Sequence, residues 1–104
     1  MNEKIKEVLL ELSDDVYLYT AKGNPLPPYI IYGIDGENNL LGGNSRSELC
    51  DTGYIDLFTK HANDELIKAI PNALENAGIA FYLNSVQHED DTEFLHYEWR
   101  WEAA

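Results

Sequence analysis

The chain has 104 residues, of which 44% are hydrophobic, and it carries a formal net charge of −12. This length suffices for one hydrophobic core but not for two ordinary domains, and the charge repels nucleic-acid phosphates and anionic lipids, so neither a nucleic-acid-reading module nor a membrane-surface protein is expected. We also expect no leader peptide and no membrane span, which needs roughly 20 apolar residues, and the single Cys50 excludes an intrachain disulfide.

The first third of the chain predicts one helix and one short strand. Apolar residues recur at helical spacing on one face of residues 2–12, namely Ile5, Val8, Leu9 and Leu12. Residues 16–20 are rich in strand formers. Residues 21–28 combine glycine, asparagine and three prolines, which is typical of a loop.

Two strands and a long loop are predicted in the middle of the chain. Residues 29–34 are apolar on both faces, which favours a central strand. Residues 35–47 are polar and glycine-rich and predict a loop, and they lack the Gly-Lys-Ser/Thr ending of a phosphate-binding loop. Residues 49–60 predict the next strand, with Ile55 and Leu57 on one face.

A second helix is predicted over residues 64–77. Asn63 or Asp64 is suited to cap its beginning, and Gly78 is suited to end it in a left-handed conformation. Pro71 lies inside this span and removes one helical hydrogen bond. It therefore predicts a kink or a division into two short helices.

A hairpin of strands 79–87 and 94–102 is predicted to close the chain, with an acidic tip between them. In the last strand the aromatic residues Tyr97, Trp99 and Trp101 alternate with charged or polar ones. Trp99 is expected in the core. Trp101 is expected at the margin of the core or against a neighbouring subunit.

No residue set in the sequence predicts catalysis or a cofactor. Three histidines, His61, His88 and His96, raise the possibility of a metal site, but a zinc ion needs three or four ligands on rigid elements, so a solvated hairpin turn is the favoured interpretation. The serines lack a G-x-S-x-G pattern. We therefore predict a non-enzyme without metal or cofactor.

The order of these elements resembles a known group of virus proteins. The segments PPYIIYGI, GYIDLFTK with its following helix, and FLHYEWRWEA are similar to those of tail terminator and tail completion proteins, which sit at the head–tail junction of long-tailed bacteriophages and prophages. The resemblance covers nearly the whole chain. It implies an α+β fold: a single small domain with a mainly antiparallel sheet of about four strands and two helices packed on one face.

The resemblance also implies an assembly and its partners. Such a protein forms a ring, commonly a hexamer, that caps the tail tube protein and joins it to the head connector or stopper protein. DNA passes through its channel without specific binding, and the protein resides in the virion after synthesis in the bacterial cytoplasm. The residues expected to meet partners lie in two loops: Glu37, Asn38, Leu40, Leu41 and Arg46 in the first, and His88, Glu89, Asp90 and Asp91 in the second.

Two other interpretations stay open at this level. The acidic charge suits an inhibitor that mimics DNA and blocks a DNA-binding enzyme, which predicts a row of carboxylates on one face and salt-sensitive binding. A general bacterial interaction domain without a role in a virion is the third possibility.

Overall fold

The computed structural model describes residues 3–39 and 49–103, which form two helices and five strands. In chain order these are α1 (Glu3–Leu10), β1 (Val16–Leu18), β2 (Tyr29–Asn39), β3 (Leu49–Thr59), α2 (Leu66–Asn76), β4 (Ala80–Glu89) and β5 (Phe94–Ala103). One sheet contains all five strands in the order β1-β2-β3-β5-β4. β1 runs parallel to β2, and the other three junctions are antiparallel. The predicted α+β class is confirmed, and the short β1 adds a strand to the expected number of about four.

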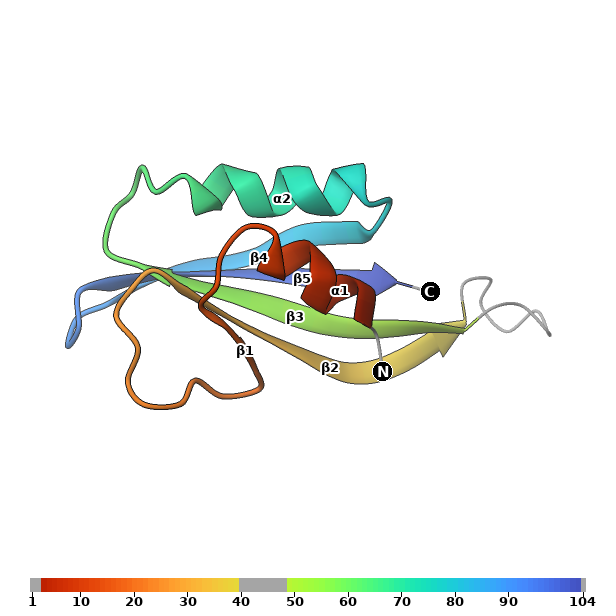
Figure 1. The fold of residues 1–104 in the computed structure, drawn as a ribbon, viewed down its shortest axis with the longest axis horizontal. Coiled ribbons are helices and arrows are strands. Elements are labelled where there is room, and N and C mark those ends of the chain that lie inside the picture. Colours follow the sequence, from red (N-terminus) through yellow and green to blue (C-terminus); the bar gives the residue numbers. More distant parts are fainter. Residues whose placement is uncertain (1–2, 40–48, 104) are drawn as a thin grey trace.

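Both helices lie on the same face of the sheet, as predicted (Figure 1). α2 packs along β4, and α1 packs beside β1 and against α2. The apolar stripes of the two helices supply fully buried side chains: Ile5 and Leu9 from α1, and Ile70 and Leu74 from α2. Each stripe follows the helical period, so burial of one face accounts for the position of each helix.

The chain crosses from the middle of the sheet to its edge through α2. β3 ends on one side of β5, and α2 carries the chain over to the edge strand β4 on the other side. The β4–β5 hairpin then returns β5 into the space between β3 and β4. As a result, the tip of this hairpin lies at the opposite end of the sheet from the end of β2 and the beginning of β3 (Figure 1).

The side chain of Asp64 stabilises the beginning of α2. Its Oδ1 accepts a hydrogen bond from the Leu66 backbone N–H at 2.9 Å, and its Oδ2 accepts one from the Thr59 hydroxyl at 2.7 Å. Thr59 is fully buried at the end of β3. One carboxylate therefore satisfies a free N–H at the helix terminus and a buried hydroxyl. The residue directly before the helix is Glu65, which makes no side-chain cap bond, so Asp64 supplies its acceptor from one residue before the N-cap position.

Gly78 ends α2, as predicted. Its φ of +74° lies in the left-handed region, which glycine adopts without steric cost. The Gly78 N–H donates to the Glu75 carbonyl and the Ile79 N–H donates to the Leu74 carbonyl, both at 3.0 Å. These bonds satisfy two carbonyls at the helix terminus and place buried Ile79 next to buried Leu74.

The structure excludes one of the two outcomes predicted from Pro71. α2 is one helix from Leu66 to Asn76, so the division into two short helices is wrong, while the kink stays a prediction. Proline lacks the N–H that would bond to the carbonyl of Ile67, which costs one hydrogen bond. Ile70 and Leu74 on either side of Pro71 are fully buried, and their packing holds the helix together.

The structure also corrects the boundary of the predicted loop 35–47. β2 continues as a strand to Asn39, because Glu37 and Asn38 pair with Asp51 and Cys50 of β3. A register shift between Ile34 and Gly36 marks an irregularity in this ladder. Backbone pairing does not require apolar side chains, so the polar sequence concealed this extension.

Candidate interaction face

Successive side chains along each strand point alternately to the buried face and to the face opposite the helices, here called the open face. Its side chains on the three inner strands include Tyr29 and Ile31 on β2, Tyr54, Asp56 and Phe58 on β3, and His96, Glu98 and Arg100 on β5. All of them are partly exposed. None of the described helices covers this face (Figure 1). It is therefore a surface on which side chains from distant parts of the sequence meet.

A row of aromatic rings crosses four strands of the open face. Tyr17 on β1 meets Tyr29 edge to face at 6.3 Å, Tyr29 stacks on Phe58 at 5.0 Å, and Phe58 stacks on the imidazole of His96 at 4.3 Å between ring centroids. Phe94 meets Tyr29 edge to face at 6.4 Å. Such pairs each contribute about 0.5–1.5 kcal/mol beyond their buried area. The row thus stabilises the sheet where no helix covers it.

His96 is paired with Asp56 next to this row. Its Nε2 lies 3.0 Å from Oδ1 of Asp56, and its Nδ1 lies 3.7 Å from Oε2 of Glu89. The Nε2–H does not point along the line to Oδ1, and no other described group bonds to either atom. The pKa of His96 is raised, chiefly by its side-chain interaction with Asp56 and against the effect of burial. The protonated imidazole is therefore the form that this site stabilises.

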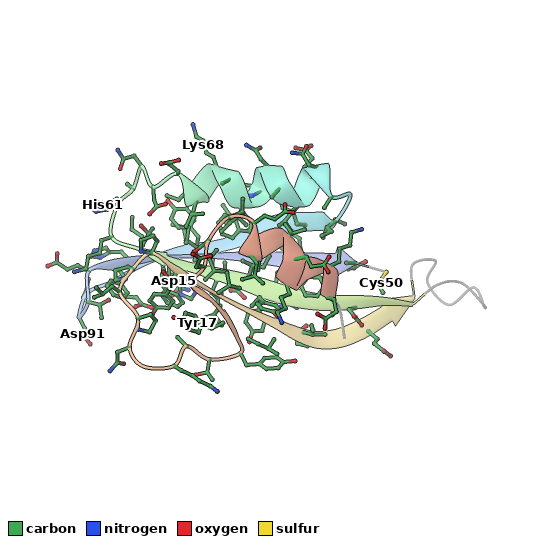
Figure 2. The ribbon with its side chains drawn as sticks, in the orientation of Figure 1. Asp15, Tyr17, Cys50, His61, Lys68 and Asp91 are labelled. Carbon is green, nitrogen blue, oxygen red and sulfur yellow. The ribbon has the colours of Figure 1, made fainter. Side chains whose placement is uncertain are left out.

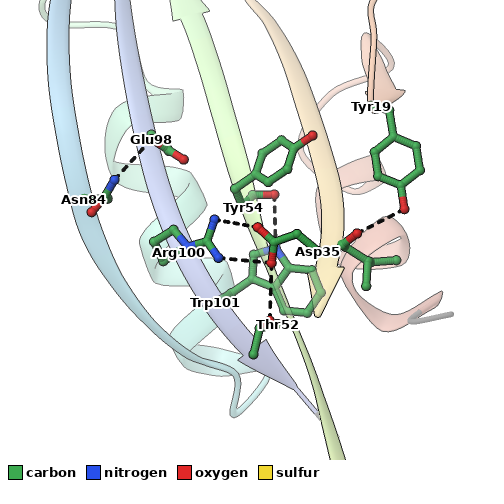
Figure 3. Close-up of polar contacts among 9 residues, drawn as sticks. Tyr19, Asp35, Thr52, Tyr54, Asn84, Glu98, Arg100 and Trp101 are labelled. Carbon is green, nitrogen blue, oxygen red and sulfur yellow. Dashed lines mark hydrogen bonds and ion pairs between the residues drawn. The ribbon is translucent and has the colours of Figure 1, made fainter. Parts of the chain in front are cut away.

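A second ion pair joins β2 to β5 across β3 (Figure 3). The two terminal nitrogens of Arg100 approach the two carboxylate oxygens of Asp35 at 2.8 and 3.1 Å. The Thr52 hydroxyl donates to Asp35 Oδ1 at 3.3 Å. The hydrogen bond from Arg100 holds the pKa of Asp35 below its ordinary value. This bidentate pair links strands that are not adjacent in the sheet.

Two glycines allow aromatic rings to lie flat on the sheet, one on each face. A side chain at Gly33 would collide with the ring of Tyr54 on the open face. A side chain at Gly53 would collide with the backbone oxygen of Gly33 and with the indole of Trp101 on the other face. The sheet therefore depends on glycine at both positions, because each occupies a site where no Cβ fits.

Trp101 is part of the core, and the prediction that it lies at the margin is wrong. It is 2% exposed, and its indole N–H donates to the Tyr54 carbonyl at 3.1 Å (Figure 3). The space left by Gly53 on the neighbouring strand admits the indole ring. Nearness to the end of the sequence misled the prediction, because β5 runs between two other strands up to Ala103.

The second predicted interaction loop lies at the opposite end of the sheet from the beginning of β3. Asp91 lies at the tip of the β4–β5 hairpin, and Cys50, at the beginning of β3, lies at the other end (Figure 2). At the tip, His88 Nδ1 lies 3.4 Å from Asp90 Oδ1, and both side chains are largely exposed. Glu89 is partly exposed and lies at the end of β4. The four predicted residues of the second loop are therefore brought together.

The first predicted loop is described only in part. Glu37 is exposed on β2, and Asn38 occupies a strand position opposite Cys50. Leu40, Leu41 and Arg46 lie outside the described residues.

The described residues, 3–39 and 49–103, contain no group of three or more His, Cys, Asp or Glu side chains arranged to hold a metal ion. Within the same ranges no helix has the length and apolarity of a membrane-crossing segment. His96 meets Asp56 and Glu89, while His88 lies beside Asp90. These histidines thus take part in separate pairs.

Sequence reasoning did not find the contacts that organise the open face. Alternation along the last strand correctly places His96, Glu98 and Arg100 on one face. The partners of these residues depend on the register of β5 against β3, in which Phe58 lies opposite His96. The sequence has no local signal for such contacts, since partners such as Asp35 and Arg100 are 65 positions apart.

Comparison with known proteins supports this fold. No protein family matches the sequence, and no curated protein matches it. Eight chains of solved structures match, among them a chain in the virion of a native gene transfer agent (GTA) particle. That chain is 13% identical, the alignment covers 98% of this chain and 84% of that chain, and the TM-score is 0.51. At this identity, the similarity shows that the two chains share a fold.

Proposed function

We propose that this protein is a structural component of a phage virion and that its copies form a ring at the head–tail junction. The ring terminates or completes the tail tube and joins it to the head connector. The observation that carries this proposal is the fold shared over 98% of the chain with a protein of a gene transfer agent virion. The sequence resemblance to tail terminator proteins supports the finer assignment to the junction.

The ends of the molecule suit a joining role. A joining ring needs one surface toward the connector and another toward the tail tube. The hairpin tip with Asp91 and the beginning of β3 with Cys50 lie at opposite ends of the same sheet (Figures 1 and 2). A rigid sheet between them fixes their separation, so each end can serve a different partner.

The charge supports a channel for DNA. We assign the open face to the lumen, because it carries Glu98 and Glu102 as well as the paired Asp35 and Asp56. Carboxylates that face the channel raise the energy of contact with DNA phosphates, so the genome moves through without adhering.

This function involves no catalysis. Two acidic side chains of the open face are engaged in ion pairs, Asp56 with His96 and Asp35 with Arg100. Asp35 and Asp56 are neutralised within the chain, whereas a DNA mimic would present such carboxylates to a basic partner.

Deletion of the gene from the parent phage tests the proposal. Electron microscopy of the lysate should show filled heads without tails, together with free tails of irregular length. Supply of the wild-type gene in trans should restore joined particles. Normal tails of regular length joined to heads in the deletion strain would refute the proposal.

A further inference from the structure

The outer strands of the sheet carry most of the exposed large apolar side chains. Among the described residues, six of the seven such side chains flank the two edges, and Leu26 in a loop is the exception. Leu10, Leu18 and Tyr19 lie beside the β1 edge, and Tyr82, Leu83 and Val86 lie on β4 at the other edge. β4 pairs with β5 alone within the described chain, so its other side presents unpaired backbone groups.

Each edge strand contains an uncharged stretch, although the chain as a whole is strongly acidic. Residues 80–87 contain no charged side chain, and neither do residues 16–21. Two copies with a net charge of −12 each repel one another over most of their surfaces. These uncharged stretches are where copies approach at the lowest electrostatic cost, which favours a second copy as the occupant of each edge.

A hollow at one edge and projecting apolar side chains at the other lie on the same side of the sheet. A hollow of about 250 Å³ lies between α1 and β1, lined by Lys6, Leu10, Val16, Leu18 and Tyr32. It opens on the helix-covered side of the sheet, since Leu18 is opposite buried Tyr32. Leu83 and Val86 project on the same side, opposite Trp99 and Tyr97. If the sheet continues from one copy to the next, Leu83 and Val86 of one copy therefore lie on the same face as the hollow of its neighbour.

We propose that copies of this chain join head to tail, with β4 of one copy against β1 of the next and with Leu83 and Val86 seated in the hollow beside α1. In a closed ring all copies keep the same direction along the axis. β4 runs opposite to β1 within the sheet, so the new junction is antiparallel, like three of the four junctions inside the chain. This inference rests on the ring proposed above and names its two contact surfaces.

Cysteine cross-linking of the full chain tests this contact. Leu18→Cys and Val86→Cys place one thiol on each edge, and Cys50, which is 1% exposed, stays in place. Oxidation of the double variant at high protein concentration, and within purified tails, should produce a ladder of covalent multimers. A mixture of the two single variants should produce dimers only. A version with Cys50→Ala confirms that the native thiol is not the cross-linked one.

The single variants and a third position provide the controls. Each single variant alone should give no cross-link, and neither should Asn72→Cys, which is exposed on α2. Dimers of Val86→Cys alone would show twofold β4 pairing and overturn the head-to-tail contact. Absence of cross-links in both solution and tails would overturn it as well. The phenotype of the deletion strain is scored independently of cross-linking. A ladder of cross-linked multimers, together with normal tails in the deletion strain, would refute only the phage role.

Discussion

Nε2 of His96 lies 3.0 Å from Oδ1 of Asp56 on the open face, and both side chains are less than one-fifth exposed. Phe58, stacked on the imidazole, shields the pair from one side. The pair therefore couples the protonation of one histidine to the stability of the sheet.

The first prediction concerns this coupling. Because the pKa of His96 is raised in the folded protein, the pair contributes stability that is fully present below the unfolded pKa of about 6.5 and is lost as the pH rises through the folded value. Asp56→Asn should therefore destabilise the protein more at pH of about 5.5 than at about 9. Urea unfolding at the two pH values measures this difference, and an NMR titration should show a lower His96 pKa in the variant.

A double-mutant cycle with His96→Gln supplies the control for the pH effect. In the presence of His96→Gln, the Asp56→Asn substitution should lose its pH dependence. Equal destabilisation by Asp56→Asn at both pH values would show that the pair is not the source of the effect.

The second prediction concerns Gly53. A methyl group there meets the backbone oxygen of Gly33 and the ring of Trp101, neither of which can move easily. Gly53→Ala should cost about 1–3 kcal/mol or more of unfolding free energy. Gly36→Ala is the matched control, since its nearest neighbour is the movable Thr52 hydroxyl at 3.0 Å. Denaturant unfolding measures both, and equal effects would contradict the proposed crowding.

The third prediction concerns the cap of α2. Asp64→Ala removes the bond to the helix N–H and leaves the buried Thr59 hydroxyl without its acceptor. Together these losses should cost about 2 kcal/mol or more. Glu65→Ala, at an exposed neighbouring position, should change stability by less than about 0.5 kcal/mol. A small effect of Asp64→Ala would show that water replaces the carboxylate.

The fourth prediction concerns Pro71. Pro71→Ala restores an N–H to the helix interior, which should stabilise the protein by about 2 kcal/mol after the greater freedom of the unfolded chain is subtracted. The melting temperature should rise by about 4–8 °C for each kcal/mol. A fall in melting temperature would mean that packing of the proline ring outweighs the missing hydrogen bond.

The fifth prediction concerns the charge of the channel. Glu98→Lys with Glu102→Lys reverses two carboxylates of the open face, and DNA phosphates should then adhere to the lumen. Particles should assemble normally but deliver their genome less efficiently, as measured by infectious titre per particle. Glu65→Lys, directly before α2, with Glu75→Lys on α2 is the matched control for total charge. Unchanged delivery in the first pair would contradict the assignment of the open face to the lumen.

Local patterns in the sequence predicted most of the elements. The helix beginning near Asp64 and ending at Gly78 was recognisable because capping and left-handed termination depend on a few adjacent residues. The alternation before Trp101 likewise identified a strand. The extension of β2 to Asn39 was missed because its residues become a strand only through pairing with β3.

The sequence by itself determined the α+β class, the amphipathic faces of both helices and the acidic charge, since each depends on residue type and short-range spacing. The tertiary structure alone decided that Trp101 is buried, that His96 meets Asp56 and that the uncharged stretches of β1 and β4 lie at the two edges. These features arise from strand order and register. Both are set by the packing of the whole sheet, because contacts between residues far apart in the chain have no local signal.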